Sequence, residues 1–360
     1  NLDADMVRVS SDVLAHNIDR EDDLKEFHVY LNQETVSRNG YFPMSGMLSN
    51  IDIADGGSTS AETIIKLTRL DAKIRFIFKA GTRADERGQK INSFTAKQWR
   101  VINVPRTSNL MDYTDRTATG NDSGAVDPAT GTDKYAEHSA DFFDSPWTNF
   151  ENFGTDGTSG FSFYMLENRQ TPKASPATYQ DRSRQVKRDG GQNQSTTFTF
   201  TNPTTGKQES RDMRIFQNAN DFSTYVLVTG RVDMELTNDA AGQTLAADVQ
   251  YLIHLGDWTQ GTSGSNWSKD QYGSIADYNI CRNTSYTYTV TVNSVNNIRV
   301  EVETSQGDAS NVKENQPGAS GLVTIAKEEI ALCDAHYASK TMTFHAKNFL
   351  DSEGKSVADE

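Results

Sequence analysis

A long run of alternating side chains constrains the fold more than any other feature of this sequence. In RNTSYTYTVTVNSVNNIRVEVE, residues 282–303, the bulky residues share even positions: Tyr286, Tyr288, Val290, Val292, Ile298, Val300 and Val302. A period of two is typical of a β-strand with one buried and one solvent-facing side. The run is longer than single strands usually are, so we expect a turn or sharp bend near Asn293–Asn297.

A second run, ETIIKLTRLDAKIRFIFKAG, predicts another strand in the first third of the chain. Its first apolar residues, Ile65 and Leu67, occupy odd positions. The later ones share even positions: Leu70, Ala72, Ile74, Phe76 and Phe78. A change from odd to even positions within one strand turns every later side chain to the opposite face of the sheet. We therefore expect a β-bulge, or a strand that leaves one sheet for another, at Thr68–Arg69.

Many further short strand patterns follow, separated by turn residues and without alternating helical patterns. They are FTAKQWRVINVP, GFSFYMLENRQ, STTFTFTN, MRIFQ, FSTYVLVTGRVDMEL and LAADVQYLIHLGD. This arrangement favours an all-β protein made of antiparallel β-sandwiches over a parallel sheet.

One short helix is expected near the N-terminus, in DREDDLKEFHVYL, residues 19–31. The residues at the i, i+3, i+4, i+7 spacing of one buried helical face are Leu24, Phe27, His28 and Leu31. Asp19 is a suitable N-cap, and the acidic residues after it favour the positive end of the helix dipole.

The charge balance argues against a nucleic-acid partner. The chain carries 35 Lys and Arg against 49 Asp and Glu, a formal net charge of −14, whereas nucleic-acid binders gain affinity from clustered cations. The most basic stretch, residues 181–191, has no aromatic residue for base stacking and is expected to be an exposed loop. No stretch approaches the roughly 18 consecutive apolar residues of a membrane helix.

Metal and disulfide chemistry find little support in the sequence. The acidic loop DYTDRTATGNDSGAVDPATGTD offers oxygen donors of the kind calcium prefers, namely Asp112, Asp115, Asp122, Asp127 and Asp133. Their spacing matches no calcium motif, and Asp also occurs in ordinary turns, so we expect no metal and no cofactor. Cys281 and Cys333 are compatible with pairing or with two free thiols, and the sequence leaves both open.

The sequence likewise contains no catalytic signature, such as a G-x-S-x-G elbow, a Walker loop or an H-E-x-x-H pair. His254 lies in a strand pattern, so we expect it to be packed or hydrogen-bonded. Aromatic residues in loops are candidates for a sugar-binding platform: Trp258 and Trp267, or Trp147 with Phe150 and Phe153. The alternative for these tryptophans is a role in the core or in anchoring a loop.

Five segments occur in the order typical of one known family: YFPMSG, LTRLDAKIRF, FYMLENRQ, VQYLIHLG and DYNICRNTSYTYTVTV. Together they resemble landmarks of the fimbrillin family, which comprises pilins and adhesins of anaerobic Gram-negative gut and oral bacteria. The landmarks extend from about residue 10 to residue 305.

The resemblance implies two transthyretin-like β-sandwich domains, residues 1–158 and 159–305. Residues 306–360 are expected to be a linker and a β tail that starts a further domain. Family members usually have strands ahead of the LAHNI segment, so either the first domain is abbreviated or the natural protein extends upstream. We also expect an exported lipoprotein with its lipid anchor upstream, located at the cell surface or outer membrane within a fimbrium.

The function implied is that of a non-catalytic fimbrial subunit or adhesin. In polymerising members of the family, proteolysis removes an early strand, and the exposed groove accepts a strand from a neighbouring pilin subunit. The partners expected are therefore other pilins, with host or bacterial surface ligands for an adhesin. The alternative is a carbohydrate-binding surface lipoprotein module.

Overall fold

The structure is a computed structural model in two compact units, Asn1–Gly307 and Asp308–Glu360. It describes residues 7–9, 28–31, 33–38, 42–46, 67–84, 88–110, 141–152, 159–187, 195–202, 205–237, 242–258, 274–295, 297–306, 320–325 and 344–350. In the second unit, β19 (Ser320–Ile325) pairs antiparallel with β20 (Phe344–Leu350).

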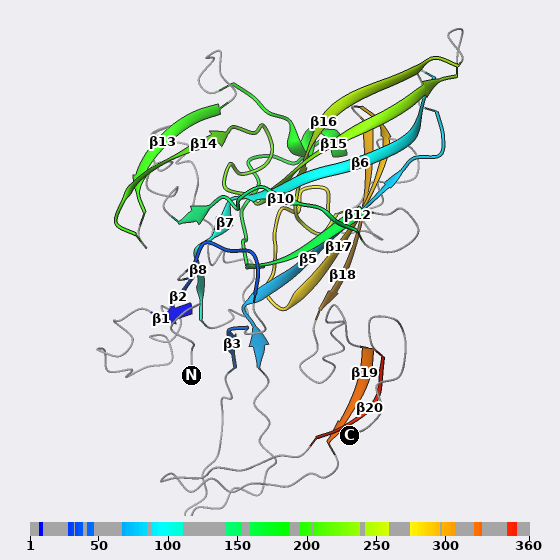
Figure 1. The fold of residues 1–360 in the computed structure, drawn as a ribbon. Coiled ribbons are helices and arrows are strands. Elements are labelled where there is room, and N and C mark those ends of the chain that lie inside the picture. Colours follow the sequence, from blue (N-terminus) through cyan, green and yellow to red (C-terminus); the bar gives the residue numbers. More distant parts are fainter. Residues whose placement is uncertain are drawn as a thin grey trace, which may run out of the picture. The chain divides into compact units, whose positions relative to one another are not determined.

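Two larger sheets form the first unit (Figure 1). The four-stranded sheet has the order β10 (Thr148–Asn149), β6 (Gln89–Ile102), β15 (Tyr225–Leu236), β16 (Thr244–His254). The five-stranded sheet has the order β11 (Glu151–Asn152), β12 (Ser159–Leu166), β5 (Asp71–Ala80), β17 (Thr284–Ser294), β18 (Asn297–Gln306). Every pairing in both sheets is antiparallel except that of β5 with β17, which is parallel.

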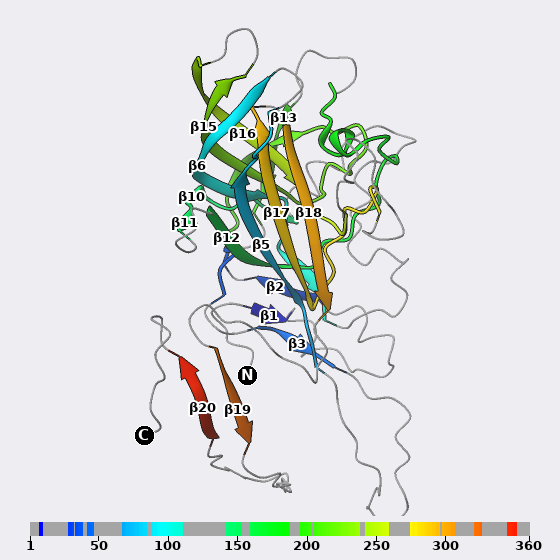
Figure 2. The ribbon, with the colours of Figure 1, turned by 90° about the vertical axis from the view of Figure 1, so that its right-hand side faces the viewer.

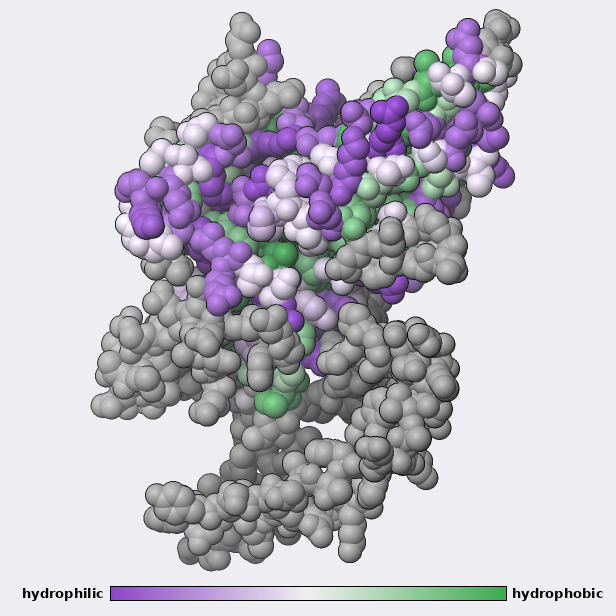
Figure 3. All heavy atoms as spheres, viewed as in Figure 1, coloured by the Kyte–Doolittle hydropathy of each residue, from purple (hydrophilic) through white to green (hydrophobic). Residues whose placement is uncertain are grey.

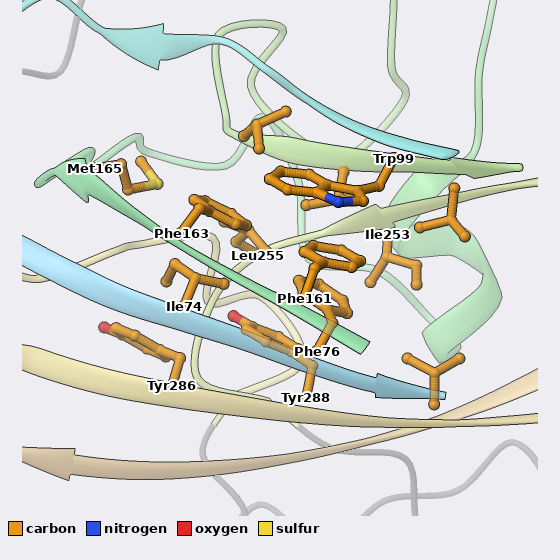
Figure 4. Close-up of a cluster of buried hydrophobic side chains, with 14 of the residues drawn as sticks. Ile74, Phe76, Trp99, Phe161, Phe163, Met165, Ile253, Leu255, Tyr286 and Tyr288 are labelled. Atoms are coloured by element: carbon orange, nitrogen blue, oxygen red, sulfur yellow. The ribbon is translucent and has the colours of Figure 1, made fainter. Parts of the chain in front are cut away.

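The two sheets pack face to face around one aromatic core (Figure 4). Trp99 of β6 stacks on Phe161 of β12 with ring centroids 4.2 Å apart. Phe161 in turn stacks on Phe76 of β5 at 5.0 Å, and Phe76 stacks on Tyr288 of β17 at 4.7 Å. All four side chains are 5% exposed or less, so the all-β sandwich predicted from the sequence is confirmed.

The alternation of the long C-terminal run is confirmed as a hairpin. Val292 pairs with Ile298 across a turn, so residues 284–294 and 297–306 are separate strands of one sheet. On the predicted face, Tyr286, Val290 and Val300 are buried to 2% exposure or less, whereas Val302 is 9% exposed and Ile298 is partly buried. Figure 2 shows β17 and β18 side by side at one margin of the sheet.

The change of parity predicted at Thr68–Arg69 marks the point where the chain leaves one sheet and enters another. β4 (Thr68–Arg69) pairs with β3 (Met44–Ser45), whereas β5, which starts at Asp71, pairs with β12 and β17. The bend falls at Leu70, and the even-numbered residues after it are buried as predicted: Ala72, Ile74, Phe76 and Phe78.

The predicted N-terminal helix is wrong at its C-terminal end, because His28–Leu31 forms strand β2. β2 lies between β1 (Val7–Val9) and β8 (Thr107–Asn109) in a three-stranded antiparallel sheet. Its last residues also alternate with period two, with Val29 and Leu31 buried, and pairing with two neighbouring strands outweighs local helix propensity. Residues 19–27 of the predicted helix lie outside the described residues.

The predicted boundary at residue 158 does not separate two sandwiches. β5 and β6 precede it, yet β5 pairs with β12 and β17, and β6 pairs with β15. Residues up to Gly307 therefore form one unit whose sheets each draw on both sides of the predicted boundary. Hydrophobic alternation marks strands but carries no information on which strands pair. The second unit begins two residues after the start of the predicted tail; that the tail opens a further domain stays a prediction.

Smaller elements are attached to the sandwich through buried polar contacts. Arg282, which is 1% exposed, donates to the carbonyl oxygen of Asn109 at 2.7 Å and to the Glu167 carboxylate, and so holds the end of β8 against β12 and β17. A hairpin of β13 (Ser195–Thr201) and β14 (Gln208–Arg214) packs Phe198 and Met213 against Phe142 in a second core. Short strands β7 (Val104–Pro105) and β9 (Phe142–Phe143) pair beside it.

The stack around Phe161 gives a prediction for stability. Phe161→Ala removes ring contacts with Trp99, Phe76 and Phe150 and leaves a cavity in the packed core. We expect a loss of about 3–5 kcal/mol in the free energy of unfolding, measured by urea denaturation. Ser162→Ala, at the next position of β12, is the control and should change stability by less than about 0.5 kcal/mol. A loss below about 1 kcal/mol for Phe161→Ala would contradict the packing described.

Candidate functional site

The structure places only some of the residues that the sequence suggested for binding. Asp112, Asp115, Asp122, Asp127 and Asp133 lie outside the described residues, as do Trp267, Phe153 and Cys333. Among the residues that are described, no group of three or more His, Cys, Asp or Glu side chains is arranged to hold a metal ion. Cys281 is half-buried, and whether it pairs with Cys333 stays open.

Trp258 is buried to 4% exposure and is not an open platform for a sugar. The guanidinium of Arg182 lies between the rings of Trp258 and Tyr278, 4.2 Å from each centroid, and the Trp258 indole donates to the His254 carbonyl oxygen at 3.2 Å. Trp258 therefore anchors a loop, the alternative considered for it. The sequence predicts an exposed loop for residues 181–191, and this prediction is wrong for Arg182, which is 1% exposed. No sequence pattern indicates that Arg182 contacts Trp258.

Arg182 is the centre of this anchor. It is 1% exposed and lies in the single-turn 3₁₀ helix η1 (Tyr179–Ser183). Its guanidinium donates to the carbonyl oxygens of Leu255 at 3.0 Å, Asp277 at 2.8 Å and Ile275. Burial lowers its pKa to about 10, so the cation persists at neutral pH and ties the end of β16 to the segment leading into β17.

His254, at the end of β16, is buried and packed, as expected from its strand position. Its Nδ1 atom lies 3.0 Å from the Ser183 hydroxyl, and its ring packs edge-on against Phe216 and Tyr278. Burial, and then the Arg182 cation, hold its pKa well below the ordinary value. Among the residues that the structure describes, none lies within hydrogen-bond distance of the buried Nε2 atom.

Trp147 and Phe150 differ in environment although they are close in sequence. Trp147 is 38% exposed, with the Arg100 guanidinium 5.5 Å from its ring centroid. Phe150 packs into the core against Phe78 and Phe161. Since β10 joins the four-stranded sheet and β11 the five-stranded sheet, Phe150 lies where the chain crosses between them and closes this margin of the sandwich.

The opposite margin is formed by two long edge strands, β16 and β18. Among the described strands, β16 pairs only with β15 and β18 only with β17. The free side of such a strand presents unpaired backbone N–H and C=O groups, which can pair with another chain. These two edges are the candidate functional site.

The β16 edge is apolar and uncharged toward its hairpin end. Val249, Tyr251 and Ile253 are buried on one face of the strand, but Leu245 on the same face is 43% exposed. No charge occurs between Thr244 and Ala247, and Asp248 is the first charged residue of the strand. Figure 3 shows hydrophobic residues interspersed with hydrophilic ones along this projecting end of β15 and β16.

The β18 edge is charged. Arg299, Glu301 and Glu303 alternate with Ile298, Val300 and Val302, so the charged side chains share the outer face of the sheet. The Arg299 guanidinium pairs with the Glu301 carboxylate at 2.8 Å. Charged residues of this kind commonly limit pairing at sheet edges. The two edges of one sandwich therefore differ in chemistry.

No family model and no curated protein matches the sequence. The chain is similar to a candidate cell adhesion protein from Parabacteroides distasonis, with 13% identity over 77% of this chain and 71% of that chain and a TM-score of 0.37. It is also similar to the tip fimbrial protein Mfa3 from Porphyromonas gingivalis with C-terminal truncation, with 12% identity, coverage of 78% and 79%, and a TM-score of 0.28. A third is a candidate cell adhesion protein from Bacteroides eggerthii, with 15% identity, coverage of 79% and 71%, and a TM-score of 0.33.

These matches are cell adhesion and fimbrial proteins, the class that the sequence landmarks resemble. The likeness to these structures is low, and the strand order of the described residues by itself defines an all-β sandwich. Within the described residues, no helix has the length and apolarity needed to span a bilayer.

His254 gives a prediction for pH dependence. Its folded-state pKa lies well below the unfolded value of 6.5, so below pH 6.5 the unfolded chain binds a proton that the folded chain does not. The free energy of unfolding should fall as the pH falls from 7 to 5.5, with this residue contributing up to about 1.4 kcal/mol per pH unit.

The comparison is with His254→Gln, measured by urea unfolding at each pH. Burial raises the pKa of Asp71 and Asp277, which gives a pH dependence of the opposite sign, but both proteins share it and it cancels in the difference. Equal slopes for the two proteins would show that His254 is not held neutral.

Proposed function

We propose that the protein is a non-catalytic cell-surface fimbrial subunit or adhesin, which joins other pilin subunits by accepting an extended strand at the β16 edge. The observation that carries the proposal is the exposed Leu245 beside the uncharged run Thr244–Ala247 on a strand with one unpaired side.

An added strand would stabilise this edge in two ways. It pairs with the free backbone groups of β16, and its alternate side chains cover Leu245, which the facing sheet leaves exposed. Backbone hydrogen bonds supply most of the affinity in such pairing, while the alternate side chains set the register. The charged β18 edge offers no comparable apolar surface.

The proposal includes the setting that the sequence resemblance implies. The protein is an exported lipoprotein, held at the outer membrane by a lipid anchor and incorporated into a fimbrium, with host or bacterial surface molecules as ligands of an adhesive member. Support for the setting comes from the ordered sequence landmarks, and support for strand acceptance comes from the chemistry of β16.

The test is Leu245→Lys in the full-length protein, produced in its native bacterium. Lys places a charge where the added strand must pack, so we expect surface fimbriae to lose most of their heat-resistant high-mass ladder on denaturing gels. The melting temperature of the purified protein should change by less than about 2 °C, because Leu245 is 43% exposed.

Thr287→Lys is the matched control, since Thr287 lies on the outer face of β17, an inner strand of the other sheet. It should leave the ladder intact. A ladder unchanged by Leu245→Lys would rule out the β16 edge as the site that accepts the added strand. A wild-type protein absent from the surface of intact cells would rule out the fimbrial role.

A further inference from the structure

The outer face of the four-stranded sheet carries polar side chains beside an exposed tryptophan. Trp99 of β6 points into the core, so its neighbours Gln98 and Arg100 lie on the outer face. The Gln98 amide is exposed and donates to the Oδ1 atom of Asn149, its cross-strand partner on β10, at 3.2 Å. Trp147, one residue before β10, is 38% exposed, and the Arg100 guanidinium lies 5.5 Å from its ring centroid.

Three arginines gather at this end of the face around one carboxylate. The Asp144 carboxylate lies 2.5 Å from the Nη2 atom of Arg211 and 3.9 Å from that of Arg100. Arg211 is 7% exposed and donates a hydrogen bond to Asp144, whereas the Arg100 contact is too long for one. Arg214 makes a 3.4 Å contact with the amide oxygen of Gln250, an exposed residue of β16. Asp144 therefore neutralises Arg211 and leaves the charges of Arg100 and Arg214 in excess.

The buried phenol of Tyr225, on β15, shows that these charges lie near one another. Burial raises the pKa of Tyr225, and the Asp144 carboxylate raises it further. The cations of Arg214, Arg211 and Arg100 act in the opposite direction. All four charged groups are thus within electrostatic reach of one hydroxyl. Three guanidinium groups against one carboxylate leave two excess positive charges, on a chain whose formal net charge is −14.

Farther along the same face, the charges cancel in pairs. Lys97 of β6 forms an ion pair with Asp248 of β16 at 2.7 Å, and Arg231 of β15 forms one with Asp233 at 3.4 Å. Within the described part of this face, the excess positive charge is therefore at the Trp147 end. A negatively charged ligand would be attracted to that end and not to the face as a whole.

The side chains at this end match the chemistry of an acidic sugar. An arginine guanidinium binds a carboxylate through parallel hydrogen bonds. An exposed indole offers a rigid apolar surface on which the C–H face of a sugar ring can pack. The amides of Gln98 and Asn149 can both donate to and accept from sugar hydroxyl groups. A ligand with a carboxylate, hydroxyl groups and an apolar ring face would use all three kinds of contact.

We propose that the outer face of the sheet around Trp147 binds a carboxylated sugar, with Arg100 on the carboxylate, Trp147 on the ring, and the amides of Gln98 and Asn149 on the hydroxyl groups. Arg214 adds to the attraction from the side of β16. The site supplies a ligand for the adhesive role proposed above, and it rests on that proposal for its biological setting alone. It does not involve the β16 edge that accepts a strand.

Isothermal titration calorimetry with the purified full chain tests the proposal. The probes are sialyllactose, with lactose as its neutral counterpart, and a hyaluronan tetrasaccharide, with chitotetraose as its neutral counterpart. The first pair represents sugar acids at the ends of surface glycans, and the second represents uronic acids within a polysaccharide. We expect one carboxylated probe to bind at least about tenfold more tightly than its neutral counterpart, and the probe that binds identifies the source.

Two variants locate the site on the protein. Arg100→Gln removes the cation, and Trp147→Ala removes the ring, so each should weaken binding of that probe at least about tenfold. Trp147→Phe keeps an aromatic surface and should retain most of the affinity. The matched control is Arg231→Gln, on the same face of β15 but paired with Asp233, which should leave binding unchanged. Thermal melts of all four variants verify that each is folded.

Three results would overturn the proposal. The first is that neither carboxylated probe binds at millimolar concentration, and the second is that each binds no better than its neutral counterpart. The third is binding that folded Arg100→Gln and Trp147→Ala proteins keep, or that Arg231→Gln weakens as much as they do. Since these measurements need no assembly, any of the three would leave the result of the Leu245→Lys experiment on the fimbrial ladder unaffected.

Discussion

The parallel pairing of β5 with β17 is the constraint on which the rest of the sandwich depends. It joins residues 71–80 to residues 284–294 and places Phe76 beside Tyr288, the last step of the ring stack that begins at Trp99. Without this pairing, the five-stranded sheet would separate into the β11, β12 and β5 strands on one side and the β17–β18 hairpin on the other. Parallel pairing also requires a long connection, which here comprises the whole chain between the two strands.

This topology explains why the functional surfaces lie at the margins of the sheets. The core side chains are covered, and the chain crossing at Phe150 closes one margin. Arg182 fixes the opposite end by binding three backbone carbonyl oxygens, so the segments flanking β16 and β17 are held in place. A sandwich whose described strands include a long edge strand with an apolar end, β16, is suited to binding an extended chain.

The sequence predicted strands and their buried faces well, because both depend on local alternation. The even parity after Leu70 and the hairpin at residues 284–306 follow directly from period-two patterns. The helix over residues 19–31 was wrong at its end because four residues fit a strand as well as one helical face, and pairing with β1 and β8 decided between them. The domain boundary at residue 158 was wrong because no local pattern reveals that β5 meets β17.

The candidate site was harder to predict from the sequence than the strands were. Trp258 was proposed for sugar binding because it stands in a loop rich in polar residues, and only the structure shows Arg182 stacked on it. Whether a strand is an edge depends on the order of strands in space, so neither β16 nor β18 could be singled out beforehand. The uncharged run Thr244–Ala247 and the charges at Arg299 and Glu301 are visible in the sequence, but their importance depends on the position of β16 and β18 as the last described strands of their sheets.

Native-state hydrogen exchange, followed peptide by peptide, tests most directly whether both parts of the chain form a single sandwich. Amides of β5 and of β17 should exchange through the same global opening, with equal free energies and equal dependence on denaturant. If the β5 peptide opened at a much lower free energy while β17 stayed protected, the two segments would belong to separate folding units, contrary to the structure described.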